Sequence, residues 1–448
     1  MLIFLLPAAT TLGALLPAGA TARFGRHVLA AALLALLMSG CSREPTTQPT
    51  ALARSATVAA VSPLEFMPTS IGASADEFGR PMVTHVQIVD LDRDGLADVL
   101  YCDARKNTVR WIRQSPRGRF NEQIIGENIR GPAHVEAADL NGSGRLDVLV
   151  ASMGQILPNN DRIGAVIVLE NIDNRQFRRR VLLENTARVT DVRASNLQGH
   201  ADGRLDLIVG QFGGVQGETR VMKNEGDWQF TSRVVNVLSG AVNVPVADFN
   251  GDGAPDFAAL ISQEWEEVHL FQNLGHGQLR DTVVWGSTNE DYGSSGLAVA
   301  DVNRDSKPDL IYTNGDGFDY AMQTPRPWHG IQWLENRGNG AFKFHRVGAM
   351  PGAYSPIAAD LNGDGTVDLL AVSCLADWAD PKTASMMAWL NDGRENFTPV
   401  VLARRPIQLV TAAVGDLDGD NIPEIVTGGF HALPPFEETS AITLWRRK

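Results

Sequence analysis

The chain has 448 residues, of which 44% are hydrophobic and 20% charged, and its formal net charge at pH 7 is −13. The hydrophobic fraction excludes a wholly disordered chain, and the length is ample for a large core. The acidic balance argues against nucleic acid and anionic membrane surfaces as partners. With only three cysteines, the chain is not a disulfide-rich scaffold.

The first 41 residues indicate an export signal. A basic region, Arg23–His27, precedes the apolar run Val28–Met38, which is too short to span a bilayer comfortably. The run ends in Leu37-Met38-Ser39-Gly40-Cys41, which resembles a bacterial lipobox. We therefore expect residues 1–41 to be a lipoprotein-type signal peptide, with Cys41 as the lipidated residue. The alternative is a plain secretory signal.

Residues 42–61 are rich in Ser, Thr, Pro and Ala, which is typical of a flexible tether. These features predict an exported protein of the bacterial cell envelope, at the outer membrane or the cell surface. It would contact the membrane through its lipid anchor only. Whether the remaining cysteines, Cys102 and Cys374, form a disulfide cannot be deduced from their spacing.

A nine-residue acidic motif recurs along the chain. Clear copies begin at Asp90, Asp139, Asp248, Asp301, Asp360 and Asp416, and a degraded copy occupies residues 198–206. Successive copies start 49 to 59 residues apart. Short apolar runs bounded by Gly, Asn and Asp flank each copy, which predicts strands, and no long stretch has helical periodicity. The spacing predicts one four-stranded sheet per repeat.

The two ends of the chain predict how the repeats close into a ring. After Glu424 the last repeat has a second strand (Ile425–Gly428) and a third (Ile442–Trp445), and then the chain ends. Leu64–Ile71 has the pattern of the missing fourth strand. Closure by this strand would leave no open sheet edge. We therefore predict an all-β fold, a seven-bladed β-propeller over residues 62–448, closed by an N-terminal strand that completes the last blade.

The seven loops and their flanking strands resemble FG-GAP/VCBS repeats, which also occur in integrin α-subunit propellers and in many bacterial envelope proteins. The resemblance covers roughly residues 62–448 and rests on six clear motifs out of seven. It implies a β-propeller with Ca²⁺ in the loops, and it implies no single activity.

The composition of the loops itself favours calcium. Acidic or amide side chains at positions 1, 3, 5 and 9 direct several oxygens towards one centre, and Ca²⁺ takes six to eight oxygen ligands. Closely spaced acids would also repel one another without a cation. We expect about six calcium sites of mainly structural importance. The predicted ligands are Asp90, Asp92, Asp94, Asp98, Asp139, Asn141, Ser143, Asp147, Asp248, Asn250, Asp252, Asp256, Asp301, Asn303, Asp305, Asp309, Asp360, Asn362, Asp364, Asp368, Asp416, Asp418, Asp420 and Glu424.

The copies differ in their acid content. The first and last each hold four acids, whereas the second holds only Asp139 and Asp147, so we expect weaker binding there. In the degraded copy, Gln198 and His200 stand at ligand positions, and we predict that this loop binds no calcium. Position 6 is a glycine in most copies, which suits a positive φ; Asn421 adopts that conformation more readily than Ser306.

Aromatic residues gather in the long loops expected on the face opposite the acidic loops. Candidate ligand-binding residues there are Tyr320, Trp328, His329 and Trp378. Exposed aromatic side chains suit either a protein partner or stacking on sugar rings. The alternative is that these rings pack the loops against the rim of the propeller.

A second candidate site lies at the start of the innermost strands. Five residues before each acidic motif stand His85, His134, Arg193, Asn243, Gly296, Ser355 and Thr411, all expected to face the mouth of the central channel. His85, His134 and Arg193 come from consecutive blades, and such a cluster suits an anion or a carboxylate. The alternative is that these are ordinary polar residues at strand starts.

Motifs for haem attachment, zinc proteases, serine hydrolases and phosphate loops do not occur. The sequence therefore favours a non-catalytic module that binds an envelope protein or a polysaccharide. The alternative is a calcium-dependent enzyme acting on polysaccharide, because some propellers of this kind resemble polysaccharide lyases. In that case His85, His134 and Arg193 would carry the chemistry. The oligomeric state cannot be deduced.

Overall fold

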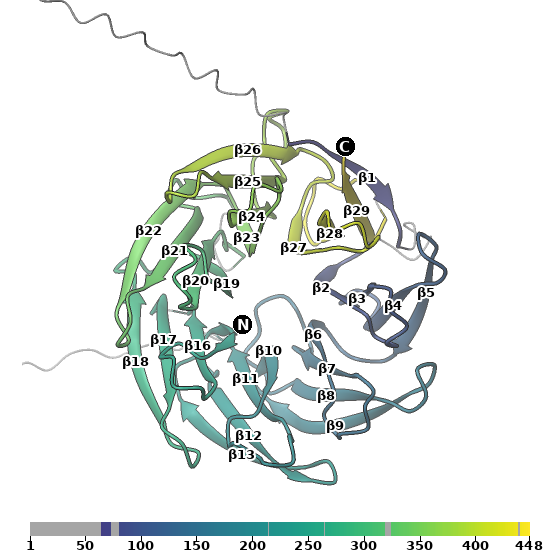
Figure 1. Cartoon of the computed structure of the whole chain (residues 1–448), viewed down its shortest axis with the longest axis vertical. Coiled ribbons are helices and arrows are strands. Elements are labelled where there is room, and N and C mark those ends of the chain that lie inside the picture. The colour runs from purple at the N-terminus through teal and green to yellow at the C-terminus, as the bar shows by residue number, and fades with distance from the viewer. Residues whose placement is uncertain (1–63, 73–79, 214, 264, 319–323, 438–439) are drawn as a thin grey trace, which may run out of the picture. The chain divides into compact units, whose positions relative to one another are not determined.

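The computed structural model describes residues 64–72, 80–213, 215–263, 265–318, 324–437 and 440–448. Residues 62–448 form one compact unit. The described residues form seven small antiparallel sheets arranged as the blades of a ring (Figure 1). The expected signal peptide with Cys41, the tether and Tyr320 lie outside the described residues. No helix in the described part of the chain has the length and apolar character needed to cross a membrane.

Each blade has four strands, except blade 4, whose innermost strand is split in two. From the innermost strand outwards, blades 1 to 3 consist of β2 (Val83–Val89), β3 (Asp98–Asp103), β4 (Thr108–Gln114) and β5 (Phe120–Gly126); β6 (Pro132–Ala138), β7 (Asp147–Ser152), β8 (Gly164–Asn171) and β9 (Phe177–Thr186); and β10 (Arg188–Ser195), β11 (Asp206–Phe212), β12 (Thr219–Gly226) and β13 (Gln229–Asn236).

Blades 4 and 5 consist of β14 (Ala241–Asn243), β15 (Val246–Ala247), β16 (Asp256–Ile261), β17 (Glu267–Asn273) and β18 (Leu279–Gly286); and β19 (Ser294–Ala300), β20 (Asp309–Asn314), β21 (Gly330–Asn336) and β22 (Phe342–Ala349). Blades 6 and 7 consist of β23 (Ala353–Ala359), β24 (Asp368–Ser373), β25 (Met386–Asn391) and β26 (Phe397–Ala403); and β27 (Leu409–Gly415), β28 (Glu424–Gly429), β29 (Ile442–Arg447) and β1 (Phe66–Ser70).

The two halves of the split strand in blade 4, β14 and β15, both pair with β16. Pro245 lies at the break. A proline has no backbone N–H to donate to the neighbouring strand, so it interrupts the ladder there.

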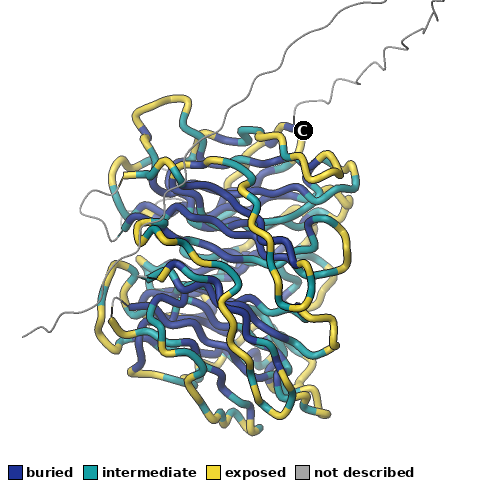
Figure 2. Tube along the Cα trace, turned by 90° about the vertical axis from the view of Figure 1, so that its left-hand side faces the viewer, coloured by how far each residue is buried: buried dark blue, intermediate teal, exposed yellow. Residues whose placement is uncertain are grey.

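The second strand of every blade is buried on both faces, as in β3 and β7. The outermost strands, such as β13, are mostly exposed or half-buried. The side view shows this layering, with buried strands inside and exposed loops around them (Figure 2). These second strands are the apolar runs that follow the acidic motifs. They are apolar throughout because each of their faces packs against a neighbouring blade.

The described residues form eight hydrophobic clusters, of which seven each lie between two adjacent blades. The eighth is smaller and consists of Cys374, Leu375 and Phe430 with the loop residues packed against them. Trp111 of β4 packs with Val148 of β7 and Ile167 of β8, for example. Trp389 of β25 packs with Trp333 of β21 in the cluster between blades 5 and 6. Burial of these large side chains contributes most of the stability of such a fold.

The ring closes as predicted. β1 pairs antiparallel with β29, from Phe66 opposite Arg447 to Ser70 opposite Thr443. Phe66 belongs to the cluster between blades 6 and 7, together with Trp445. The prediction of a seven-bladed propeller completed by an N-terminal strand is confirmed.

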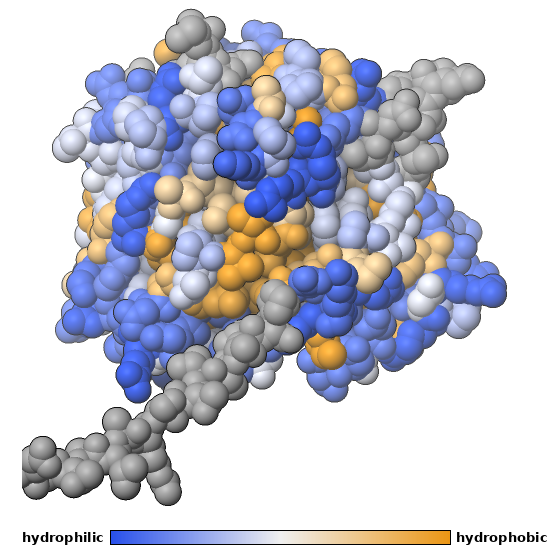
Figure 3. Space-filling model, turned by 90° about the horizontal axis from the view of Figure 1, so that it is seen from above, coloured by the Kyte–Doolittle hydropathy of each residue, from blue (hydrophilic) through white to orange (hydrophobic). Residues whose placement is uncertain are grey.

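The flank where β26 and β1 lie carries a hydrophobic area bordered by hydrophilic residues (Figure 3). Met67 of β1 is 54% exposed. The outer strands of blades 6 and 7 thus leave part of their apolar surface open to solvent.

Candidate functional site

The acidic loops join the first and second strands of each blade. In loop 90–98, Asp90 organises the turn: its Oδ1 accepts from the backbone N–H of Asp94 at 3.0 Å and its Oδ2 from that of Gly95 at 2.9 Å. The first acid of each of the other five clear copies accepts the corresponding bonds. The residue at position 6 has a positive φ even where it is Ser306 (66°) or Asn421 (65°).

The acid at position 9 has a structural role that the sequence did not reveal. Asp98 is fully buried, and its oxygens accept from the backbone N–H groups of Leu91, at 3.2 Å, and Gln114, at 2.8 Å. It therefore ties the start of its loop to the third strand. Burial raises the pKa of Asp98 to about 7. The same pair of bonds is made by Asp147, Asp206, Asp256, Asp309 and Asp368.

Two loops bring three acids within ligand distance of one centre. Oxygens of Asp90, Asp92 and Asp94 all lie within 4.8 Å of one another, as do oxygens of Asp416, Asp418 and Glu424. In the described chain, Oδ1 of Asp92 and of Asp418 are buried without a hydrogen-bond partner. A buried carboxylate oxygen without a partner is costly, and a cation would remove that cost. The all-oxygen donor set fits Ca²⁺, although its presence there stays a prediction.

The loops with Asn at position 3 hold their polar groups differently. Asn250 donates from Nδ2 to Asp252 Oδ2 at 2.9 Å, and Asn362 donates to Asp364 Oδ2 at 2.8 Å. In loop 301–309, the Lys307 ammonium lies 2.6 Å from Asp305. These contacts hold the predicted ligands close together.

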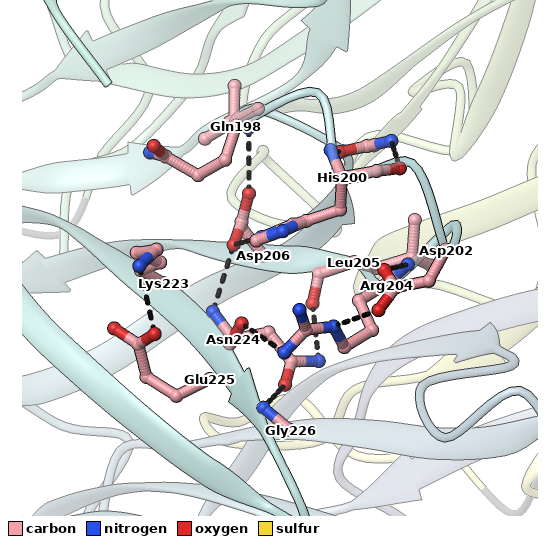
Figure 4. Close-up of polar contacts among 12 residues, drawn as sticks. Gln198, His200, Asp202, Arg204, Leu205, Asp206, Lys223, Asn224, Glu225 and Gly226 are labelled. Carbon is pink, nitrogen blue, oxygen red and sulfur yellow. Dashed lines mark hydrogen bonds and ion pairs between the residues drawn. The ribbon is translucent and has the colours of Figure 1, made fainter. Parts of the chain in front are cut away.

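In the degraded loop of blade 3, a histidine side chain contacts the position-9 acid (Figure 4). The His200 ring points towards Asp206, with Nε2 3.1 Å from Oδ1, and Asp206 also accepts from the backbone N–H groups of Gln198 and Asn224, both at 2.9 Å. Asp202 pairs instead with Arg204, Nε to Oδ2 at 2.7 Å. The imidazole thus contacts the one buried acid of this loop.

One residue predicted at the start of the inner strand in each of the seven blades lines a common cavity of about 380 Å³. These are His85, His134, Arg193, Asn243, Gly296, Ser355 and Thr411. His85 and His134 lie opposite the fourth residue after the position-9 acid of their blades, whereas Arg193 lies opposite Ile208, the second residue after Asp206. The register predicted for Arg193 is therefore wrong by two residues, because the degraded loop differs in length, and Asp191 has the matching register in blade 3. The inner strands run from this cavity towards the acidic loops, so the cavity opens at the other end of the channel. Long loops add apolar walls, including Leu157, Phe318 and Phe430.

His85, His134 and Arg193 are linked by a contact between the two rings and by a buried acid. The rings of His85 and His134 lie with their centroids 4.0 Å apart. Asp191, which is fully buried, lies 3.2 Å from His134 Nδ1 and accepts from Arg193 Nε at 2.9 Å. The His134 contact has the distance but not the angle of a hydrogen bond, so both of its ring nitrogens remain buried without a bonded partner in the described residues.

Both imidazoles are neutral. Burial, assisted by the neighbouring positive charge of Arg193, holds the pKa of His85 and of His134 well below the usual value. His85 Nδ1 accepts from the backbone N–H of Val135 at 3.4 Å, so the neutral ring carries its proton on Nε2. In the described residues, the hydrogen bonds of Arg193 run through Nε to Asp191, which leaves both Nη groups available.

Sequence reasoning missed several residues of this site. Asp191 and Glu136 flank Arg193, and burial raises the pKa of Glu136 to about 7. Arg188 is also buried at the cavity wall, where it donates to the carbonyl oxygens of Ile156 and Leu157. The alternation of β10 carries a signal for Asp191, since it stands two residues before Arg193 and so lies on the same face of the strand.

The candidate aromatic residues do not form one exposed face. His329 is buried, and its Nδ1 accepts from the backbone N–H of Gly352 at 3.3 Å. Trp328 is half-buried, and its indole N–H donates to the Asp291 carbonyl at 2.9 Å. Trp378 is 8% exposed and lines a separate cavity of about 520 Å³. For these three residues the structure favours the alternative, in which the rings hold the loops against the propeller.

Comparison with known proteins agrees with this description. The family model described as FG-GAP-like repeat matches residues 90–150, 201–259, 248–312 and 313–371, which together cover just over half of the chain. The chain belongs to the FG-GAP-like repeat family. The last match ends within blade 6, and the sheet of blade 7 has the same four-stranded antiparallel arrangement as the matched blades.

The solved structures similar to this FG-GAP-like propeller are distant in sequence. Virginiamycin B lyase from Staphylococcus aureus superposes with a TM-score of 0.52 at 11% identity, over 85% of this chain and 99% of that one. BBS1N, in a mercury-soaked complex with ARL6DN, gives a TM-score of 0.51 at 11% identity, over 85% and 96%. At this identity the likeness shows the fold alone. No curated protein matches the sequence.

Proposed function

We propose that this FG-GAP-like propeller is a calcium-binding protein of the bacterial cell envelope that acts as a non-catalytic binding module. Its ligand is an envelope protein or a polysaccharide. The observation that carries the proposal is the cavity to which the inner strands of all seven blades contribute residues. Calcium in the acidic loops stabilises the opposite face, so the scaffold and the ligand site are separate.

The chemistry of the cavity suits an acidic group on a partly apolar body. The two Nη groups of Arg193 and the Nε2–H of His85 offer donors, and a planar guanidinium matches a carboxylate. Leu157, Phe318 and Phe430 supply apolar contact around them. Cavities with apolar walls and a few placed polar groups are typical ligand sites.

The same cluster argues for binding rather than catalysis. A general base must reach the proton that it removes. Both nitrogens of His134 are buried, and Arg193 is held by Asp191. The polysaccharide-active enzyme is therefore the alternative outcome of the test and not the proposal.

The position in the cell rests on the N-terminal sequence. Cleavage before Cys41, followed by lipidation, would anchor the propeller through residues 42–61. Mass spectrometry of the mature protein tests this directly, because a lipid-modified Cys41 at the N-terminus is expected. An unmodified serine or alanine at the mature N-terminus would contradict it.

The binding proposal is tested by capture from detergent-solubilised envelope. The full chain serves as bait in calcium, with Arg193→Gln as the site variant and Arg179→Gln as the control, because Arg179 lies on the outer strand β9. We expect wild type and the control to retain a stoichiometric protein or an acidic polysaccharide, and Arg193→Gln to lose it. Equal retention of the ligand by Arg193→Gln and Arg179→Gln would exclude the cavity as the ligand-binding site. Formation of unsaturated sugar ends in a captured polysaccharide would favour the enzyme.

A further inference from the structure

The two four-acid loops differ from the others at position 3. They carry Asp92 and Asp418 there, whereas the other clear copies carry Asn141, Asn250, Asn303 or Asn362. An extra carboxylate in so small a loop adds repulsion when no cation is bound. The structure must compensate for this charge in the absence of calcium.

An arginine from the third strand contacts the extra acid in both blades. In blade 1, Arg113 Nη2 lies 2.6 Å from Asp92 Oδ2 and 3.0 Å from Asp94 Oδ2. In blade 7, Arg446 Nε lies 3.0 Å from Asp418 Oδ2. The side chain of Asp92 is 5% exposed and that of Arg113 is 36% exposed, so the acid is buried while the arginine remains partly in contact with water.

The two arginines occupy the same place in their blades. Arg113 follows Ile112, which pairs with Val99, the residue after the ninth-position acid of its loop. Arg446 follows Trp445, which pairs with Ile425, again the residue after the ninth-position acid. At this register the other five blades carry Glu170, Lys223, Gln272, Glu335 and Leu390. An arginine therefore stands only where position 3 is an aspartate.

The contact leaves the other oxygen of each acid for a cation. Oδ1 of Asp92 and Oδ1 of Asp418 are buried without a hydrogen-bond partner in the described residues, while Oδ2 of each is held by its arginine. With Arg446 counted, loop 416–424 has the same formal charge, −3, as the three-acid loop 248–256. Loop 90–98 also contains Arg93, so its formal charge is −2 with Arg113 counted.

We propose that Arg113 and Arg446 are built-in counter-ions of these two loops, which hold the position-3 acid in place without calcium and moderate the calcium affinity. They are positioning residues for the site, and the inference rests on the calcium part of the proposed function. Both loops lie where blades 1 and 7 meet: Gln114 Nε2 donates to the Leu417 carbonyl at 2.9 Å, and Arg117 donates to the Asp418 carbonyl. The two counter-ions therefore lie in the two blades that meet where the first and last repeats of the ring adjoin.

The proposal predicts effects of opposite sign. Arg113→Gln and Arg446→Gln should lower the unfolding midpoint in chelator, because the extra acid loses its partner. The same variants should bind calcium more tightly at the affected loop, by about threefold to tenfold, because a positive charge near the ion is removed. A residue with a merely structural role would lower stability without tightening calcium binding.

The experiment uses the full chain in detergent, with calorimetric titration of calcium and thermal unfolding in chelator and in calcium. Lys223→Gln is the matched control, because Lys223 has the same register in blade 3 and pairs with Glu225 at 2.8 Å outside the loop acids. It should change neither measurement. The double variant Asp92→Asn with Arg113→Gln recreates a three-acid loop, and it should regain most of the stability lost in chelator.

Weaker or unchanged calcium binding in both arginine variants, at wild-type site number, would overturn the proposal and leave the calcium function intact. Absence of any calcium binding by wild type would overturn both. If Arg113→Gln fails to fold, Arg113→Lys retains the charge and should keep the wild-type affinity. A tenfold change in affinity with Arg113→Lys would also contradict the counter-ion role.

Discussion

The buried acid of the degraded loop offers a clean test of what the position-9 acids contribute to folding. Asp206 is fully buried and accepts from two backbone N–H groups and from the His200 ring. Asp206→Ala would leave the N–H groups of Gln198 and Asn224 without an acceptor. A buried donor without a partner costs about 1–3 kcal/mol, so the two together predict a loss of about 2–5 kcal/mol.

The assay is urea unfolding in chelator, where calcium does not contribute. Asp202→Ala is the control in the same loop, since its side chain is 57% exposed and pairs only with Arg204. It should change the free energy of unfolding by less than about 0.5 kcal/mol. A value for Asp206→Ala within that limit would refute the structural role assigned to position 9.

Three other parts of the fold lead to predictions of their own. Replacing both Gln198 and His200 by Asp should restore a complete acidic motif in blade 3, and titration should then find one more bound calcium than in wild type. Phe66→Ala should destabilise the closure by about 3–5 kcal/mol in urea unfolding, because Phe66 is buried between blades 6 and 7, whereas the exposed Met67→Ala should be nearly neutral. The pKa of Glu136 is raised to about 7, so the folded state binds the proton of this group more tightly than the unfolded chain does. This group therefore makes the free energy of unfolding fall as pH rises from about 4.5 to about 7. Glu136→Gln should flatten that part of the pH profile of stability, and an unchanged profile would contradict the assignment.

The fold was predictable because its signals repeat. Seven copies of one motif fixed the number of blades, and the missing partner of Ile442–Trp445 pointed to the N-terminal strand. The convergence of His85 and His134 on one cavity also followed from their shared distance to the motif. Arg193 lines the same cavity, but two residues away from the register that its distance to the degraded motif predicted.

Other features depend on contacts that sequence spacing hides. Arg113 stands 15 residues after its position-9 acid and Arg446 stands 22 after its own, because the connecting loops differ in length, so their common register is not visible in the sequence. The burial of His329 and Trp378 depends on how long loops fold against neighbouring blades, for which the sequence has no periodic signal.

Closure by β1 also has a consequence for how the protein is made. Among the described strands, Phe66–Ser70 is synthesised first, whereas its partner in the sheet, β29, is synthesised after all the others. Lys448, the final residue, donates from its backbone N–H to the Glu65 carbonyl at 3.0 Å. A prematurely terminated chain therefore retains an unpaired strand edge, which favours aggregation or proteolysis. The pairing of β1 with β29 thus makes protection of the first strand depend on synthesis of the last described one.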